Sequence, residues 1–335
     1  MRIGQSLSDL GTLVRCGRFA AGLPAAIGFA HGTLGGLNNA YDRRVTAAVE
    51  RAITDVAERA RMDAALRAMS MKMGMAMLSY ARLAGRAQRL EAAALAGAVT
   101  RLYDDLVDGS VDGSIGYRLY DLFNNRPFTA STDLERLLAV LVAEIRCQVQ
   151  RIDPAVIALN SLHEYQILSR HQQEPGVELA VLEKICRGKG AMANLTLCSL
   201  IKPDMDAGER ELVMALGEVF QSLDDYMDVH LDTRNGIATL ASLGVITLTD
   251  IGLRLRELRP LLATCYGRGP TRRYYGMIYF VLLKAAVERR LPVLGQLFKR
   301  LIRRSSLKVF VIKGTDALPA APRGEADPCD GYAGA

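Results

Sequence analysis

Residues 41–85 read YDRRVTAAVERAITDVAERARMDAALRAMSMKMGMAMLSYARLAG, and they carry an almost unbroken helical pattern. Apolar side chains recur every three to four positions, at Val45, Val49, Ile53 and Val56, and charged residues lie between them. This spacing is typical of an amphipathic helix. Alanine, methionine and arginine, which dominate the stretch, lose little side-chain freedom in a helical turn. The stretch therefore predicts a helical protein.

The same pattern continues along the chain, which extends the prediction to the whole fold. Further helices are predicted in residues 91–109, 131–152, 153–172, 178–201, 207–232 and 249–266. The short runs GVITL (244–248) and KVFVI (308–312) have the composition of strands, but nothing supplies a sheet for them. The expected fold is all-α, a single-domain helical bundle.

Three segments follow from composition. Residues 42–313 form the predicted helical domain, and the Pro-, Gly- and Ala-rich residues 314–335 are expected to be a disordered tail. Residues 1–41 are predicted to be an N-terminal segment that is partly loop. Within it, the uncharged run 19–41 contains several Gly and Pro and two Asn, so we interpret it as a loop or a short packed helix rather than a membrane span.

The positive charge of the chain is concentrated near its C-terminal end. The net charge is +6, but residues 284–313 hold nine Lys and Arg against one Glu. This distribution argues against a general nucleic-acid surface. Residues 283–308 are a basic amphipathic stretch and predict peripheral contact with an anionic membrane, with a plain solvated helix as the alternative. The six cysteines lack CxxC spacing, which favours a reduced, cytoplasmic compartment.

Two acidic segments stand out from this helical background, RLYDDLVDG (101–109) and FQSLDDYMDVHLD (220–232), and they resemble each other locally. Positions i, i+1, i+4 and i+8 fall within about a quarter of the helix circumference. The carboxylates at that spacing are Asp104, Asp105 and Asp108, and then Asp224, Asp225, Asp228 and Asp232. A single such motif is usually a solvated face. Two of them among apolar neighbours predict a partly buried cleft, where unpaired carboxylates cost several kcal/mol.

Such a cleft favours divalent cations. Carboxylate oxygens without His or Cys select Mg²⁺ or Mn²⁺ over zinc, and Mg²⁺ commonly bridges a few carboxylates to substrate phosphates. Two facing helices of this kind would clamp a diphosphate. The diphosphate also needs cationic partners, for which the candidates are Arg170, Lys189 and Arg234, each with a solvated surface charge as the alternative.

These motifs resemble those of the class I isoprenoid synthase superfamily over residues 60–245. DDLVD is similar to the first DDxxD motif, and FQSLDDYMD to the second motif of chain-elongating prenyl synthases. The Lys- and Arg-rich stretches of those synthases are absent. MDVHLDTRNGIATL (227–240) is closer to squalene and phytoene synthases. Large terpene synthases have motifs similar to three stretches of this chain, LDDYMDVHLD, KGAMANLTL (189–197) and DAALRAMSMK (63–72).

The resemblance implies a helical bundle with a central active-site cavity, three Mg²⁺ ions held by the seven aspartates and a prenyl diphosphate substrate. The resemblance then implies that the catalytic residues are Asp104, Asp105, Asp108, Asp224 and Asp228. In addition, the spacing of Asp224, Asp228 and Asp232 matches that of the Asn/Ser/Glu metal-binding triad of terpene cyclases. The leading hypothesis is a class I terpene synthase. The alternatives are a prenyltransferase of the squalene/phytoene synthase type and a non-enzymatic helical scaffold or regulatory subunit. A homodimer is the candidate assembly, and the sequence does not determine the oligomeric state.

Aromatic side chains that could stabilise a carbocation are limited, because the chain has no Trp. This role would fall to Tyr80, Tyr103, Tyr165, Phe220 and Tyr226. The helical core needs such residues in any case, so a purely structural role is the alternative. The four histidines share no ligand spacing apart from His163 and His171, and we interpret all four as structural or surface residues.

Overall fold

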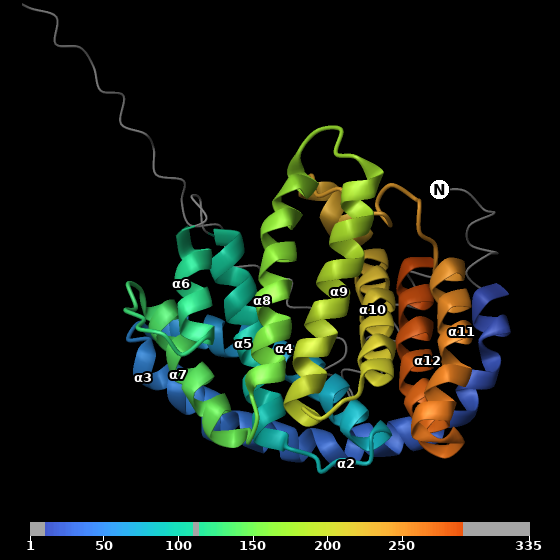
Figure 1. The fold of residues 1–335 in the computed structure, drawn as a ribbon, viewed down its shortest axis with the longest axis horizontal. Coiled ribbons are helices and arrows are strands. Elements are labelled where there is room, and N and C mark those ends of the chain that lie inside the picture. The colour runs from blue at the N-terminus through green and yellow to red at the C-terminus, as the bar shows by residue number, and fades with distance from the viewer. Residues whose placement is uncertain (1–10, 110–113, 291–335) are drawn as a thin grey trace, which may run out of the picture.

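The computed structural model describes residues 11–109 and 114–290, and every regular element in these ranges is a helix (Figure 1). The all-α prediction is confirmed. The elements are η1 (Gly17–Gly22), α2 (Leu23–Tyr41), η2 (Asp42–Thr46), α3 (Ala47–Ala52), α4 (Val56–Leu83), α5 (Leu90–Gly109), α6 (Ser114–Phe123), α7 (Asp133–Gln148), α8 (Asp153–Leu168), η3 (Ser169–Gln173), α9 (Leu179–Ile201), α10 (Ala207–Arg234), α11 (Leu248–Tyr266) and α12 (Arg268–Arg290).

Several helices begin at side chains that cap their first turn. The Asp55 carboxylate accepts from the backbone N–H of Glu58 at the start of α4, and Asp206 accepts from that of Glu209 at the start of α10. Thr247 and Asp250 form a reciprocal capping box on α11. Each cap satisfies a backbone donor that the helix itself leaves unpaired.

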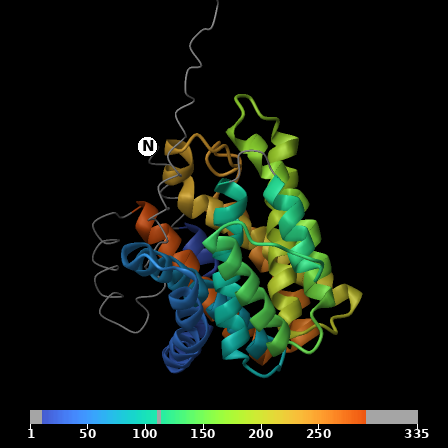
Figure 2. The same ribbon diagram turned by 90° about the vertical axis from the view of Figure 1, so that its left-hand side faces the viewer.

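Two antiparallel helical hairpins form the centre of the bundle. Helices α4 and α5 are joined by residues 84–89, and α9 and α10 by residues 202–206. Each of these pairs, together with α8 and α9, packs over a long interface. Figure 1 shows α5, α8, α9 and α10 side by side, with α2 crossing the lower end. In the turned view, α2 and α12 lie toward one side of the bundle and α8 and α9 toward the other (Figure 2).

The N-terminal run 19–41 differs from the expected loop or short packed helix. Most of it forms the 19-residue helix α2, which packs against α4, α5 and α12. The reason is a buried stripe at helical spacing: Ala26, Ala30, Leu34 and Leu37 face the core. Glycines on the outer face weaken this helix by only about 1 kcal/mol each, so core packing decides its conformation.

Other sequence predictions fall on turns or outside the described ranges. The segment 244–248 forms a turn that leads into α11 instead of a strand. The run 308–312 and the tail 314–335 lie outside the described residues, as does most of the basic stretch 283–308. Within residues 11–109 and 114–290, no helix combines the length and apolar character needed to cross a membrane.

Candidate functional site

Both acidic motifs lie near the C-terminal ends of the second helices of the two hairpins. Asp104, Asp105 and Asp108 are on α5, and Asp224, Asp225 and Asp228 are on α10. The likeness extends beyond the aspartates, because both helices share the pattern G-x-V-x-x-x-x-D-D-x-x-D. It begins at Gly97 in α5 and at Gly217 in α10. The two motifs therefore occupy equivalent places in two similar hairpins.

The glycine that opens each pattern is a point of close helix contact. A Cβ on Gly97 would overlap the Cα of Ser70 on α4. A Cβ on Gly217 would overlap the carbonyl oxygen of Gly190 on α9, and a Cβ on Gly190 would overlap that of Gly217. Only glycine permits backbones to approach so closely. In both hairpins the first aspartate follows this crossing by seven residues, or about two helical turns.

A lysine from the first hairpin reaches the motif of the second. The Lys72 ammonium, on α4, lies 2.7 Å from Asp224 Oδ1. Attraction to Asp224 raises the pKa of Lys72, and Asp228 and Asp104 add to this effect. The side chains of Lys72 and Asp224 are 48% and 40% exposed, so the pair is accessible to a ligand.

Lys189 makes the corresponding connection from the second hairpin. It is half-buried on α9, next to the crossing glycine Gly190. Its positive charge lowers the pKa values of both Asp104 and Asp225. The ammonium group is therefore within electrostatic reach of both motifs, which places α5 and α10 around one shared site.

The second aspartate of each motif is held by the residue one turn before it. Arg101 Nε donates to Asp105 Oδ2 at 2.9 Å, and Gln221 Nε2 donates to Asp225 Oδ1 at 2.7 Å. The Arg101 and Asp105 side chains are only 14% and 17% exposed. The thiol of Cys186 lies 3.5 Å from the Ser222 hydroxyl and also helps to lower the pKa of Asp225. Burial raises the pKa of this thiol to about 12, so it remains protonated.

Helix α8 and the following η3 contact the first motif from one side. Gln166 Nε2 donates to Asp108 Oδ1 at 3.1 Å, and Arg170 donates to the carbonyl oxygen of Val107 at 3.3 Å. Gln166 is almost fully buried, and its Oε1 has no hydrogen-bond partner within the described residues. An unsatisfied buried oxygen beside a carboxylate cluster is suited to a hydrogen-bond donor or a cation.

The remaining predicted residues lie at the ends of the site. Asp232 is half-buried one turn after Asp228, and Arg234 is exposed in the last turn of α10. His163 accepts or donates a 2.7 Å hydrogen bond with Tyr103 Oη, while His171 pairs with Glu174. Both histidines thus make contacts within the protein, and their structural role stays an interpretation.

Burial and mutual repulsion perturb three of the carboxylates. Burial, together with the nearby Asp108 and Asp105, raises the pKa of Asp104 to about 6 despite the opposing attraction of Lys189. Burial also raises the pKa of Asp225 to about 6, with a contribution from Asp224. The pKa of Asp105 is raised by burial and Asp108, although Arg101 opposes the shift. The site therefore carries excess negative charge that a cation would relieve.

The ligand atoms offered by these side chains are of the type that Mg²⁺ prefers, but they are not arranged around a common point. Six carboxylates and the Gln166 oxygen are hard ligands of the kind that Mg²⁺ prefers. Within residues 11–109 and 114–290, however, no three His, Cys, Asp or Glu side chains are gathered closely enough to hold an ion. Lys72, Lys189 and Arg101 instead provide the positive charge among the aspartates. The three-ion cluster stays a prediction.

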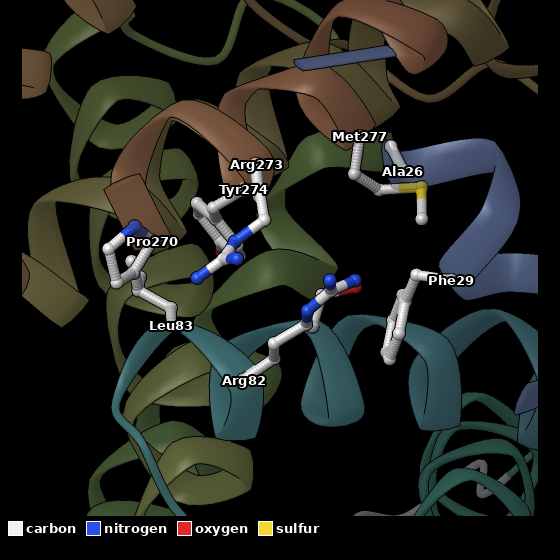
Figure 3. A pocket seen from close by; sticks show the side chains of 9 residues that line it. Ala26, Phe29, Arg82, Leu83, Pro270, Arg273, Tyr274 and Met277 are labelled. Carbon is white, nitrogen blue, oxygen red and sulfur yellow. The ribbon is translucent and has the colours of Figure 1, made fainter. Parts of the chain in front are cut away.

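A small, open depression in the described part of the chain lies elsewhere, between α2, α4 and α12 (Figure 3). The predicted central cavity beside the two motifs accordingly stays a prediction. Of the aromatic side chains considered for it, Tyr80, Tyr103 and Tyr226 are buried, while Tyr165 and Phe220 are half-buried. Tyr80 lies in a separate polar cluster with Glu209 and Tyr266.

Sequence patterns indicated the aspartates and Lys189, but not all of their partners. Lys72 ends the stretch DAALRAMSMK without being recognised as a site residue. Arg101 and Gln221 could have been found from their i, i+4 spacing to Asp105 and Asp225. No local signal marked Gln166 or Cys186, since their contacts depend on how separate helices pack.

Comparison of the chain with protein-family models, with curated proteins and with solved structures gives no match. The class of protein is therefore argued from the fold and from this arrangement of side chains.

Proposed function

We propose that the protein is a Mg²⁺-dependent class I terpene synthase, which ionises an allylic prenyl diphosphate and converts the carbocation to a terpene hydrocarbon or alcohol. One observation carries the proposal: lysines on the first helix of each hairpin reach the aspartates of the other hairpin. Lys72 contacts Asp224, and Lys189 acts on Asp104. Acidic and basic groups from four helices thus share one site, as the recognition of a metal-bound diphosphate requires.

The chain's own residues have three roles in this proposal. The aspartates of α5 and α10 are the candidate ligands of the cations. Lys72 and Lys189 would donate hydrogen bonds to diphosphate oxygens, and Arg170 lies at the edge of the first motif. Half-buried apolar side chains beside the motifs, such as Leu106 and Met227, would exclude water from the carbocation.

Bound Mg²⁺ would supply positive charge that stabilises the departing diphosphate. The reaction breaks the bond between the allylic carbon and its oxygen, and the electron pair leaves with the diphosphate. Loss of a proton from the carbocation gives a hydrocarbon, and capture of water followed by loss of a proton to solvent gives an alcohol. The second candidate is a prenyltransferase of the squalene/phytoene synthase type. It is favoured by the continuation MDVHLDTRNGIATL and begins with the same ionisation.

The test is diphosphate release with Mg²⁺ and a series of allylic prenyl diphosphates of ten to twenty-five carbons, each with and without isopentenyl diphosphate. Products are identified by gas chromatography and mass spectrometry. A product with the carbon number of its substrate supports the terpene synthase. A product of doubled length supports the second candidate, and one extended by five carbons indicates a chain-elongating synthase.

Matched variants connect turnover to the site. Asp104→Asn and Asp224→Asn should each reduce diphosphate release by at least about 100-fold, since each removes a charge from the candidate cation site. Glu211→Gln removes an exposed charge from the same helix as Asp224 and should leave turnover unchanged. Absence of turnover with every substrate would contradict both enzymatic candidates and favour the helical scaffold.

A further inference from the structure

A second, basic site lies further along α4, toward its C-terminal end, about two to three turns beyond Lys72. A small depression that opens to solvent lies between α2, α4 and α12. Its polar lining consists of Ser79 and Arg82 from α4 and Arg273 from α12. Apolar walls are provided by Ala26, Phe29, Leu83, Pro270, Tyr274 and Met277. Figure 3 shows the Arg82 side chain, from α4, and the Arg273 side chain, from α12, entering the same space.

The two arginines are not balanced by acidic residues. Burial lowers the pKa of Arg82, and the positive charge of Arg273 lowers it further. The Arg82 guanidinium lies over the Phe29 ring, 4.9 Å from its centroid. Neither arginine forms an ion pair with a carboxylate among the described residues. The two positive charges repel each other, and an anion between them would relieve this repulsion.

The serine provides an independent observation. Ser79 is 6% exposed, and its hydroxyl has no hydrogen-bond partner among the described residues. It precedes Arg82 by three positions, so both side chains lie on the same face of α4. A buried hydroxyl without a partner costs free energy unless a ligand or water satisfies it. The depression therefore offers one unsatisfied O–H and two guanidinium groups.

The charge of α12 supports the same interpretation. Arg268, Arg272 and Arg273 lie in its first two turns, and no acidic residue lies in the first turn. Basic side chains are unfavourable near a helix N-terminus, where the helix dipole is already positive. Arg272 donates to the carbonyl oxygen of Ala21, whereas Arg273 lines the depression. An anion between α4 and α12 would offset this unfavourable charge.

We propose that this depression binds a phosphoryl group, held by Arg82, Arg273 and the Ser79 hydroxyl. Guanidinium groups match a tetrahedral oxyanion through paired N–H donors. Phe29 and Met277 would contact an apolar substituent next to the phosphoryl group. The site is separate from the acidic motifs: Arg82 follows Lys72 by ten residues on α4, which is about 15 Å along the helix. It does not depend on the proposed terpene synthase activity.

Isothermal titration calorimetry tests the proposal with the full chain in a chelating buffer without divalent cations. The probes are inorganic phosphate, n-butyl phosphate, and vesicles of phosphatidylcholine with and without phosphatidic acid. Inorganic phosphate should bind one site per chain. Tighter binding of n-butyl phosphate would identify a small phosphate ester as the source of the group. Binding only to phosphatidic acid vesicles would identify a lipid headgroup.

Variants locate the bound anion. Arg82→Gln and Arg273→Gln should each weaken phosphate binding at least tenfold, and Ser79→Ala several-fold. Arg268→Gln removes the same charge from the exposed start of α12 and should change the affinity by less than twofold. Arg273 is exposed, so its substitution tests the proposal even if Arg82→Gln does not fold.

Two results would overturn the proposal. One is absence of binding by every probe. The other is binding that Lys189→Gln abolishes and the two arginine substitutions leave unchanged, because the anion would then occupy the site between the acidic motifs.

Discussion

Lys72 and Asp224 are 152 positions apart in the chain, yet their side chains meet at 2.7 Å across two hairpins. Both side chains are nearly half exposed, and such pairs typically stabilise a protein by about 0–1 kcal/mol. We therefore expect Lys72→Met to change the free energy of unfolding by less than about 1 kcal/mol. Loss of a charged donor to the diphosphate should nevertheless lower kcat/KM by at least about tenfold. Urea denaturation and diphosphate release measure the two effects, and an equal loss in both Lys72→Met and Lys72→Arg would contradict an electrostatic role.

Stability should depend on pH through the buried aspartates. The pKa values of Asp104 and Asp225 are about 6 in the folded protein, against 3.8 for an unperturbed side chain. Between these values the folded protein binds protons that the unfolded chain has released. The two groups therefore make the free energy of unfolding fall as the pH rises through this window, and above it their penalty is constant.

Asp104→Asn or Asp225→Asn should remove part of this pH dependence and stabilise the protein at neutral pH by up to about 3 kcal/mol. Urea denaturation across the window measures the slope for each variant. In the control variant Glu211→Gln, the free energy of unfolding should depend on pH with the same slope as in the wild-type protein. An unaltered slope in both asparagine variants would show that these carboxyls titrate normally.

The close crossing of α9 and α10 should not tolerate a methyl group. In Gly217→Ala the new Cβ would overlap the backbone of Gly190, so the helices must separate. We expect destabilisation of about 1–3 kcal/mol or more. Gly28→Ala is a matched control on α2, because a Cβ there meets nothing within 4 Å. That substitution should stabilise the protein by roughly 0.5–1 kcal/mol, and thermal denaturation distinguishes the two signs.

The effect of the Arg101 charge on the pKa of Asp105 can be tested, because Gln221 holds Asp225 in the same way without a charge. Arg101→Gln would give Asp105 the type of neutral hydrogen bond that Gln221 gives Asp225. Because Arg101 lowers the pKa of Asp105, this variant should raise that pKa, as measured by carbon NMR of the aspartate carboxyls. Arg101→Lys keeps the charge and should reproduce the wild-type value more closely. A lower pKa in Arg101→Gln would exclude the charge of Arg101 as the stabilising factor.

A last prediction concerns the buried ion pair between Lys202 and Glu209, at the opposite end of α10 from its acidic motif. The Glu209 side chain is only 2% exposed and accepts from both Lys202 and Tyr80. Glu209→Gln leaves the lysine charge without its partner, so we expect destabilisation of about 3 kcal/mol. Diphosphate release per folded molecule should be unchanged, which separates stability from turnover.

Local patterns predicted the helices because apolar spacing and caps act within a few residues. The aspartates of each motif could likewise be placed on one helix face from their spacing alone. The pairing of Lys72 with Asp224 could not be predicted, since it depends on the packing of four helices. Helix α2 was underestimated because glycine weakens a helix locally, whereas the buried Ala26, Ala30, Leu34 and Leu37 stabilise it through contacts with other helices.

The basic groups among the aspartates affect how the protein folds in the absence of a ligand. A cluster of carboxylates that relied on an external ion for neutrality would tie folding to the supply of that ion. Here Lys72, Lys189 and Arg101 act as built-in counterions. The folding of newly made chains would therefore not depend on a supply of divalent cations, and a cation bound as proposed would displace charges that the chain already carries.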